Sequence, residues 1–212
     1  MWKCCLIVLL AFTACQYKKG RMASCKSTQP VKIILQPFED ISPQQIAYLQ
    51  KELPKWYNAS IVIKPAINLP NNAWYQPRKR YISDSLLGFL NKRGRTDEEF
   101  IAGITTKDIS TQKGNIRNYG IMGQGLCPGN VCIISTHRLA RTKEQYAHIN
   151  ARLLKVVIHE LGHNFGLPHC PNQSCIMVDA EGKDKLPQEK DLCPKCRSYL
   201  SQHGFLPVRI KR

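Results

Sequence analysis

Two histidines and a glutamate in the C-terminal half of the chain have a spacing that suits hydrolysis at a metal ion. His159, Glu160 and His163 form the pattern H-E-x-x-H. Because residues four apart share one face of a helix, His159 and His163 can direct their imidazoles at one ion. Neutral imidazoles leave zinc with its positive charge, which lowers the pKa of a bound water to roughly 7. Glu160 can take the proton from that water and pass it toward a leaving amine.

The residues that follow supply a third ligand. Gly166 stands three positions after His163, and glycine readily takes the left-handed conformation that ends a helix and turns the chain back. This turn allows His169 to return to the same ion. Three protein ligands plus water make the open coordination of a catalytic zinc, not the closed shell of a structural one. The sequence therefore predicts a catalytic zinc held by the three histidines, with Glu160 as the general base.

Four further cysteines could hold a second metal ion. They are Cys170, Cys175, Cys193 and Cys196. The last two form a C-x-x-C knuckle, which suits two thiolate ligands on one ion and is poorly placed for a bridge between distant segments. The tail that carries them has little apolar face to bury, so a closed four-thiolate zinc could organise it. Two disulfides are the alternative if the chain is exported to oxidising surroundings, but the spacing favours zinc.

The whole string resembles the signature of metzincin peptidases, and the cysteine layout sharpens the resemblance. After His169 the chain continues as Cys170, four residues, Cys175-Ile176-Met177, and then the C-x-x-C knuckle, with seventeen residues between Cys175 and Cys193. This layout, which covers about a fifth of the chain, resembles the archaemetzincin family of metallopeptidases. The segments Gly123-x-Gly125 and Ser135-Thr136-x-Arg138-Leu139, upstream of the motif, are also similar to the family.

The resemblance implies both a fold and a set of cofactors. The fold is α/β (α+β) and metzincin-like, with a five-stranded mixed sheet, two supporting helices, an active-site helix and a small Cys-rich C-terminal zinc-bound tail. The cofactors are two Zn²⁺ per chain, one catalytic and one structural. Met177 matches the Met-turn residue, whose thioether lies beneath the zinc-binding histidines. The segment Tyr119–Gly125 would be the antiparallel edge strand that pairs with extended substrate.

Hydrophobic periodicity predicts elements that agree with this fold. Strands are expected at residues 31–35, 59–64, 100–105, 119–125 and 131–135. A first helix begins at Ser42 and Pro43, which suit the cap and the first helical position, and a second helix covers residues 83–92. These two helices are the supporting ones.

The active-site helix is expected to be the longest. A capping box at Thr142 and Gln145 begins it, and apolar residues such as Tyr146 and Leu153 recur with helical spacing up to Phe165. The sequence therefore predicts one helix without a break. No long periodic element is expected in the tail.

The first 15 residues have the order of a secretory signal. Lys3 gives a positive start, and residues 6–12 form an apolar core that is too short to span a bilayer. Thr13 and Ala14 then precede Cys15, which resembles the lipobox of bacterial lipoproteins and implies cleavage before Cys15 and its lipidation. An uncleaved membrane anchor is the alternative. The expected organisation is a signal at 1–15, a tether at 16–29 and a metallopeptidase domain at 30–212, lipid-anchored at the cell envelope and facing the periplasm or the exterior.

The composition limits the classes of partner. The formal net charge is +16, but the lysines and arginines are scattered and no aromatic residues interleave with them. This pattern indicates a basic solvated surface and argues against nucleic acid as a partner.

A chain of 212 residues with 43% hydrophobic content fits one domain, expected to act as a monomer on peptide or protein substrates. Cys127 and Cys132 either form a local disulfide or remain free thiols, and Cys25 is left over.

Two functions fit these observations. The first is a zinc-dependent metallopeptidase that hydrolyses peptide bonds, as an aminopeptidase or an endopeptidase. The alternative is a catalytically silent zinc-bound peptide-binding module at the cell envelope. Glu160 favours the enzyme, because the general base is the residue that a silent relative could most easily lose.

Overall fold

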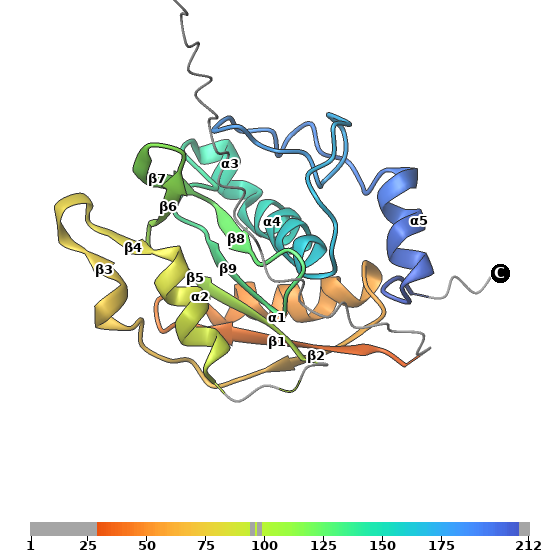
Figure 1. The fold of residues 1–212 in the computed structure, drawn as a ribbon, viewed down its shortest axis with the longest axis horizontal. Helices are drawn as coiled ribbons and strands as arrows, with labels where there is room; N and C mark the ends of the chain where they lie inside the picture. The colour runs from red at the N-terminus through yellow and green to blue at the C-terminus, as the bar shows by residue number, and fades with distance from the viewer. Residues whose placement is uncertain (1–28, 94–95, 97–98, 208–212) are drawn as a thin grey trace, which may run out of the picture.

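The structure is a computed structural model that describes residues 29–93, 96 and 99–207. The predicted signal, its lipidation site Cys15, Cys25 and nearly all of the tether lie outside the described residues. The central element is a five-stranded sheet of order β2-β1-β5-β9-β8 (Figure 1). Its strands are β1 (Val31–Pro37), β2 (Ala59–Ile63), β5 (Glu99–Thr105), β8 (Gly123–Gly125) and β9 (Val131–Ser135). β8 is antiparallel to β9 and the other pairs are parallel, so the prediction of a five-stranded mixed sheet is confirmed.

Helices cover both faces of this sheet because its strands are apolar on both sides. Successive side chains of a strand point to opposite faces, so Ile33 and Ile34 of β1 belong to two separate cores. The Ile33 core packs against α1 (Pro43–Glu52) and α4 (Ile149–Asn164). The Ile34 core packs against α2 (Ser83–Asn91). The two supporting helices and the active-site helix are therefore present as predicted.

The active-site helix is interrupted, which corrects the prediction of one continuous helix. The capping box of Thr142 and Gln145 is present, but it starts a separate short helix, α3 (Lys143–Ala147). His148, with φ −108° and ψ 16°, breaks the helical conformation before α4 begins. The reason is burial: α3 has no buried residue and Tyr146 is 61% exposed, so no core contact holds α3 in line with α4.

A second sheet, which the sequence did not reveal, lies beside the first. It has the order β3-β4-β6-β7. Its strands are β3 (Trp74–Tyr75), β4 (Arg80–Ile82), β6 (Ile109–Lys113) and β7 (Ile116–Ile121). The single strand predicted at 119–125 is therefore wrong. Its first part belongs to β7 and pairs with β6, while β8 pairs with β9, and Met122 alone separates the two. The chain bends at Met122, and a short apolar run cannot show from sequence that the pairing partner changes there.

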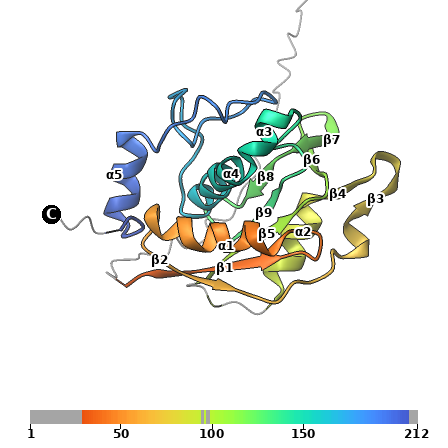
Figure 2. The same cartoon turned by 180° about the vertical axis from the view of Figure 1, so that it is seen from behind.

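The tail after the active-site helix is mostly irregular but ends in a helix that was not predicted. This helix, α5 (Pro194–Gln202), has only Cys196 and Leu200 buried, which is too sparse an apolar stripe to be read from sequence. Phe205 beyond it stacks on Phe165 with ring centroids 4.2 Å apart. Figures 1 and 2 show α5 at the end of the molecule opposite the β3–β4 hairpin.

Three short 3-10 turns complete the described elements: η1 (Leu53–Lys55), η2 (Asn71–Ala73) and η3 (Gln76–Arg78). In the part of the chain that the structure describes, no helix combines the length and the apolar character needed to cross a membrane.

Candidate active site

The imidazoles of His159, His163 and His169 converge beside α4, as the sequence predicted. One ring nitrogen from each lies within 4.8 Å of the others. Nδ1 of His159 lies 2.6 Å from the carbonyl oxygen of Ile176, and Nδ1 of His163 lies 2.7 Å from that of Leu167. A proton on each Nδ1 satisfies these carbonyls and leaves both Nε2 lone pairs free. The two Nε2 atoms are 3.1 Å apart, where lone pairs repel unless a cation or a proton lies between them. The donor set therefore fits a metal ion.

The environment keeps the two helix histidines uncharged. Burial, with a smaller contribution from neighbouring His163, lowers the pKa of His159 to about 3. Burial also lowers the pKa of His163. Because only neutral imidazole can ligate a metal, both side chains are in the ligating protonation state at neutral pH.

The turn at Gly166 brings the third histidine back, as expected. Gly166 has a φ of +95°, and its N–H donates to the carbonyl of His163 at 2.9 Å. Nδ1 of His169 then lies 3.6 Å from Oδ2 of Asp179. The sequence analysis missed Asp179, because a carboxylate that orients a ligating histidine has no fixed spacing from it. A hydrogen bond from the N–H of Glu181 lowers the pKa of Asp179, which keeps its carboxylate ionised.

Glu160 is buried between α4 and β8, with 6% of its surface exposed. A Cβ at Gly123 would come within 2.5 Å of Oε1 of Glu160, so only glycine lets β8 lie this close to the carboxylate. Burial raises the pKa of Glu160 to about 8, and a hydrogen bond from the N–H of Gly125 opposes the rise. A carboxyl group with a pKa near neutrality can both accept and return a proton, as a general base and acid must.

Met177 packs against the turn of α4 that carries the two histidines. A Cβ at Gly162 would lie 2.5 Å from its sulfur, so the thioether fills the space that this glycine leaves. Met177 is fully buried, and the preceding residue supplies the carbonyl that receives His159. Its contact is packing and not ligation, as the sequence analysis expected of a Met-turn residue.

The four cysteines of the tail come together as thiols. Sγ of Cys170 lies 3.7 Å from that of Cys193, and Sγ of Cys175 lies 3.8 Å from that of Cys196. All four sulfurs lie within 4.8 Å of one another. Four sulfurs at about 2.3 Å from a tetrahedral zinc are about 3.8 Å apart, whereas a disulfide has its sulfurs about 2.0 Å apart. The spacing fits one tetrahedral ion and not two disulfides.

The question that the sequence left open for Cys127 and Cys132 is answered by the structure. Both are free thiols. Cys132 is fully buried in β9, whereas Cys127 is exposed and its thiol lies 3.5 Å from the carbonyl of Leu167.

A cleft of about 570 Å³ lies over the histidines. Residues 119–125 line one wall, residues 178–184 line the opposite wall, and His159, Glu160 and His163 lie between them. β8 is the last strand of its sheet, with β9 on one side only. No strand of the described residues pairs with its other edge, although the N–H of Gly125 donates to Glu160. Such an edge can bind an extended peptide by main-chain hydrogen bonds.

Comparison with known proteins agrees with this geometry. The model of peptidase family M54 matches residues 46–202. The archaemetzincin of Methanopyrus kandleri is 31% identical over 145 residues, which cover 67% of this chain and 78% of that protein. The archaemetzincin of Haloquadratum walsbyi is 27% identical over 172 residues, which cover 77% of this chain and 96% of that protein.

Solved structures show the same similarity. The crystal structure of archaemetzincin from Archaeoglobus fulgidus, complexed with malonate, matches with a TM-score of 0.67 and 27% identity. The match covers 79% of this chain and 99% of that one. Together with the family match over residues 46–202, these relatives show that the chain belongs to peptidase family M54, the archaemetzincins, and is a zinc-dependent metallopeptidase.

Proposed function

We propose that the chain hydrolyses peptide bonds at a zinc ion held by His159, His163 and His169, with Glu160 as the general base. The observation that carries this proposal is the pair of facing Nε2 atoms 3.1 Å apart, beside a buried carboxyl group. Zinc bound there supplies Lewis acidity, which polarises the scissile carbonyl and lowers the pKa of a coordinated water.

The protein groups have separate tasks in this reaction. Glu160 accepts the proton of the attacking water and returns it to the leaving amine. The free edge of β8 aligns the substrate main chain over the site. Carbonyl oxygens hold the rings of His159 and His163 by hydrogen bonds, and the carboxylate of Asp179, 3.6 Å from Nδ1 of His169, favours the ligating orientation of the third ring by its charge.

The proposal also gives the chain a second, structural zinc. Cys170, Cys175, Cys193 and Cys196 would form its closed four-thiolate shell, and the sulfur separations of 3.7 and 3.8 Å support this. The tail between α4 and α5 has little regular structure, so a metal that ties its two ends together would stabilise it.

The test compares the wild-type chain with Glu160→Gln, using a peptide library read by mass spectrometry. Glu160→Gln should keep its zinc content and lose about 10²- to 10⁴-fold in kcat, because the neutral amide cannot accept a proton. Glu144→Gln, at an exposed position of α3, serves as the matched control and should leave kcat unchanged. Cleavage by Glu160→Gln at the wild-type rate, or cleavage that survives a chelator, would contradict the mechanism.

We further propose that the chain is exported and held at the cell envelope by lipid on Cys15. The support is the order of residues in the sequence: a positive start, an apolar core at 6–12 and small residues before Cys15. In cells that process lipoproteins, the full chain should partition with membranes and carry an acylated N-terminal cysteine by mass spectrometry. Cys15→Ser should abolish both properties, whereas Cys25→Ser should keep them. A Cys15→Ser chain that still carries lipid would contradict the proposal.

A further inference from the structure

Three cationic side chains, those of Lys113, Arg138 and Arg141, line the cleft. Lys113 belongs to β6, and Arg138 lies against β7, so these two are at the same end. Among the described residues, neither Lys113 nor Arg141 makes an ion pair, and the ammonium of Lys113 lies 5.1 Å from the centre of the Tyr119 ring. Asp179 is near enough to interact electrostatically with Lys113, but no carboxylate of the described residues lies within ion-pair distance of Lys113 or Arg141.

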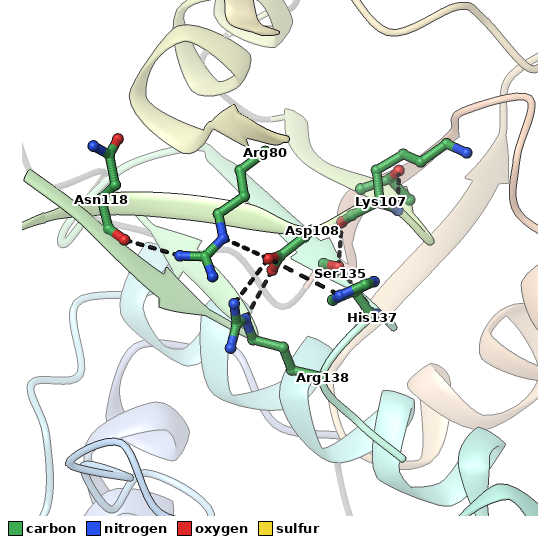
Figure 3. Close-up of polar contacts among 8 residues, drawn as sticks. Arg80, Lys107, Asp108, Asn118, Ser135, His137 and Arg138 are labelled. Carbon is green, nitrogen blue, oxygen red and sulfur yellow. Dashed lines mark hydrogen bonds and ion pairs between the residues drawn. The ribbon is translucent and has the colours of Figure 1, made fainter. Parts of the chain in front are cut away.

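Arg138 belongs to a network that also carries excess positive charge. Asp108 accepts hydrogen bonds from Nε and Nη2 of Arg138, both at 2.8 Å, and its Oδ2 lies 2.7 Å from Nε of Arg80 (Figure 3). Nη1 of Arg80 donates to the carbonyl of Asn118 at 3.0 Å. Because two guanidinium groups share one carboxylate, one positive charge is left over. The side chains of Arg80 and Arg138 are 24% and 23% exposed, so water screens this charge only in part.

The position of Arg138 is set by Gly120. The guanidinium of Arg138 lies directly against this glycine of β7, where a Cβ would collide with it. Since β7 leads through Met122 into β8, Arg138 lies beside the path of a peptide paired with β8. The cation is therefore within reach of a bound substrate.

The opposite wall of the cleft cancels only part of this positive charge. Two of its acidic residues pair with cations of their own, because Asp184 lies 2.6 Å from Arg152 and Glu181 lies 3.5 Å from Lys185. Asp179 stays ionised and interacts electrostatically with Lys113. Glu189 also lines the cleft, but burial raises its pKa to about 7, so it is only partly ionised at neutral pH. The uncompensated charge at this end is positive.

The direction of β8 decides which part of a substrate meets the cations. Antiparallel pairing is the more stable arrangement, and it makes the peptide run opposite to β8. β8 runs from Gly123 to Gly125, so the peptide runs past Gly123 toward Gly120, and its C-terminal part reaches Arg138. Gly120 is three positions from Gly123, which is about 10 Å at the rise of a strand.

We propose that Lys113, Arg138 and Arg141 select substrates with a carboxylate on the C-terminal side of the scissile bond, within about three residues of it. The carboxylate belongs to an Asp or Glu side chain or to the C-terminus of the peptide. This selectivity rests on the proposed peptidase function.

Binding and cleavage of matched peptides test the selectivity. One peptide carries Glu two residues after the bond and an amidated C-terminus. A second has Gln in place of Glu, and a third has Gln and a free C-terminus at that distance. Fluorescence polarisation with zinc-loaded Glu160→Gln protein measures binding, and wild-type kcat/KM measures cleavage. At low salt the first peptide should bind about tenfold more tightly than the second, and the advantage should shrink at 0.5 M NaCl. The third shows whether a terminal carboxylate serves as well.

Variants of Lys113 and Arg141 give a second test. Neither residue makes an ion pair, so these substitutions should leave the fold intact. The double variant Lys113→Gln, Arg141→Gln should lose most of the preference, whereas Lys51→Gln on α1 with Lys92→Gln after α2 should keep it. Equal binding of the Glu and Gln peptides by Glu160→Gln protein would overturn the inference. If charge preference is seen in binding and the wild-type chain cleaves no peptide, the selectivity stands and the proposed function fails.

Discussion

The side-chain amide of Asn164 donates to the carbonyl oxygens of Leu126 and Val131, both at 2.9 Å. Asn164 is the last residue of α4 and directly follows His163, while the two carbonyls flank the turn between β8 and β9. The N–H of Gly129 in that turn donates in return to the carbonyl of Asn164. One buried residue therefore ties the metal-site helix to the β8–β9 hairpin, whose outer edge is the proposed substrate-binding edge.

Asn164→Ala should weaken both stability and activity. It removes the side-chain donor from the carbonyls of Leu126 and Val131, of which Val131 keeps the N–H of Leu126, so the free energy of unfolding should fall by about 1–3 kcal/mol in urea denaturation. The hairpin should also lose its fixed distance from α4, so kcat/KM should fall at unchanged zinc content. Asn72→Ala, at an exposed position of η2, is the control and should change stability by less than about 0.5 kcal/mol. Equal stability of the two variants would refute the role given to Asn164.

Two glycine-to-alanine variants in helices should have opposite effects. Gly88 of α2 has no atom within 4 Å of the position of an added Cβ, so Gly88→Ala should stabilise by about 0.5–1 kcal/mol through helix propensity. Gly162→Ala in α4 would bring its Cβ to 2.5 Å from the sulfur of Met177 and should destabilise by about 1–3 kcal/mol. Thermal unfolding with zinc bound measures both. If Gly162→Ala stabilised the protein, the side chain of Met177 would have moved aside without a loss of packing energy.

Removal of two cysteines should halve the zinc content. Metal analysis of the wild-type chain should give two zinc ions, and the double variant Cys193→Ser, Cys196→Ser should give one, held by the histidines. Loss of the structural ion should free the tail, so amide exchange should rise in α5 and stay low in the central sheet. Cys127→Ser removes an exposed thiol outside the quartet and should keep both ions. A double variant that still binds two zinc ions would place the second ion elsewhere.

Stability should fall as pH rises from about 4.5 to 7 because of Glu189. Burial raises the pKa of Glu189 from 4.5 to about 7, so below pH 4.5 the group is protonated in both folded and unfolded chains. Above pH 4.5 the carboxyl group ionises in the unfolded chain but stays protonated in the folded chain. The free energy of unfolding therefore falls until the pH passes the folded pKa. Glu189→Gln should therefore remove about 1–3 kcal/mol of this pH dependence.

Urea denaturation of the zinc-loaded protein at pH 5 and pH 8 measures this effect. Glu144→Gln, exposed on α3, is the control and should retain the wild-type pH dependence. If Glu189→Gln retains it too, another group carries the effect.

The site motif could be predicted because its information is local. The i, i+4 spacing of His159 and His163, the turn at Gly166 and the C-x-x-C knuckle depend on neighbours in sequence, and the structure places these residues as expected. What escaped prediction depends on distant pairs. Asp108 and Arg138 are thirty positions apart, and nothing in either neighbourhood indicates that they meet.

The errors in the predicted elements have the same origin. Apolar spacing marked Tyr146 as a core position of one long helix, but burial depends on where the axis of that helix runs, and Tyr146 is exposed. The prediction of extended chain at 119–125 was correct apart from a bend at Met122. The segment counts as two strands because its first part pairs with β6 and its last part pairs with β9.

Met122, the single residue between β7 and β8, links the small peripheral sheet directly to the proposed substrate-binding edge. A substitution that tilts the outer layer formed by β3, β4 and β6 would shift β8 and the peptide-binding edge. The parallel strands and the histidines would keep their positions. Relatives of this enzyme could thus diverge in what they cut by remodelling a layer remote from the chemistry, while the hydrolytic apparatus stays unchanged.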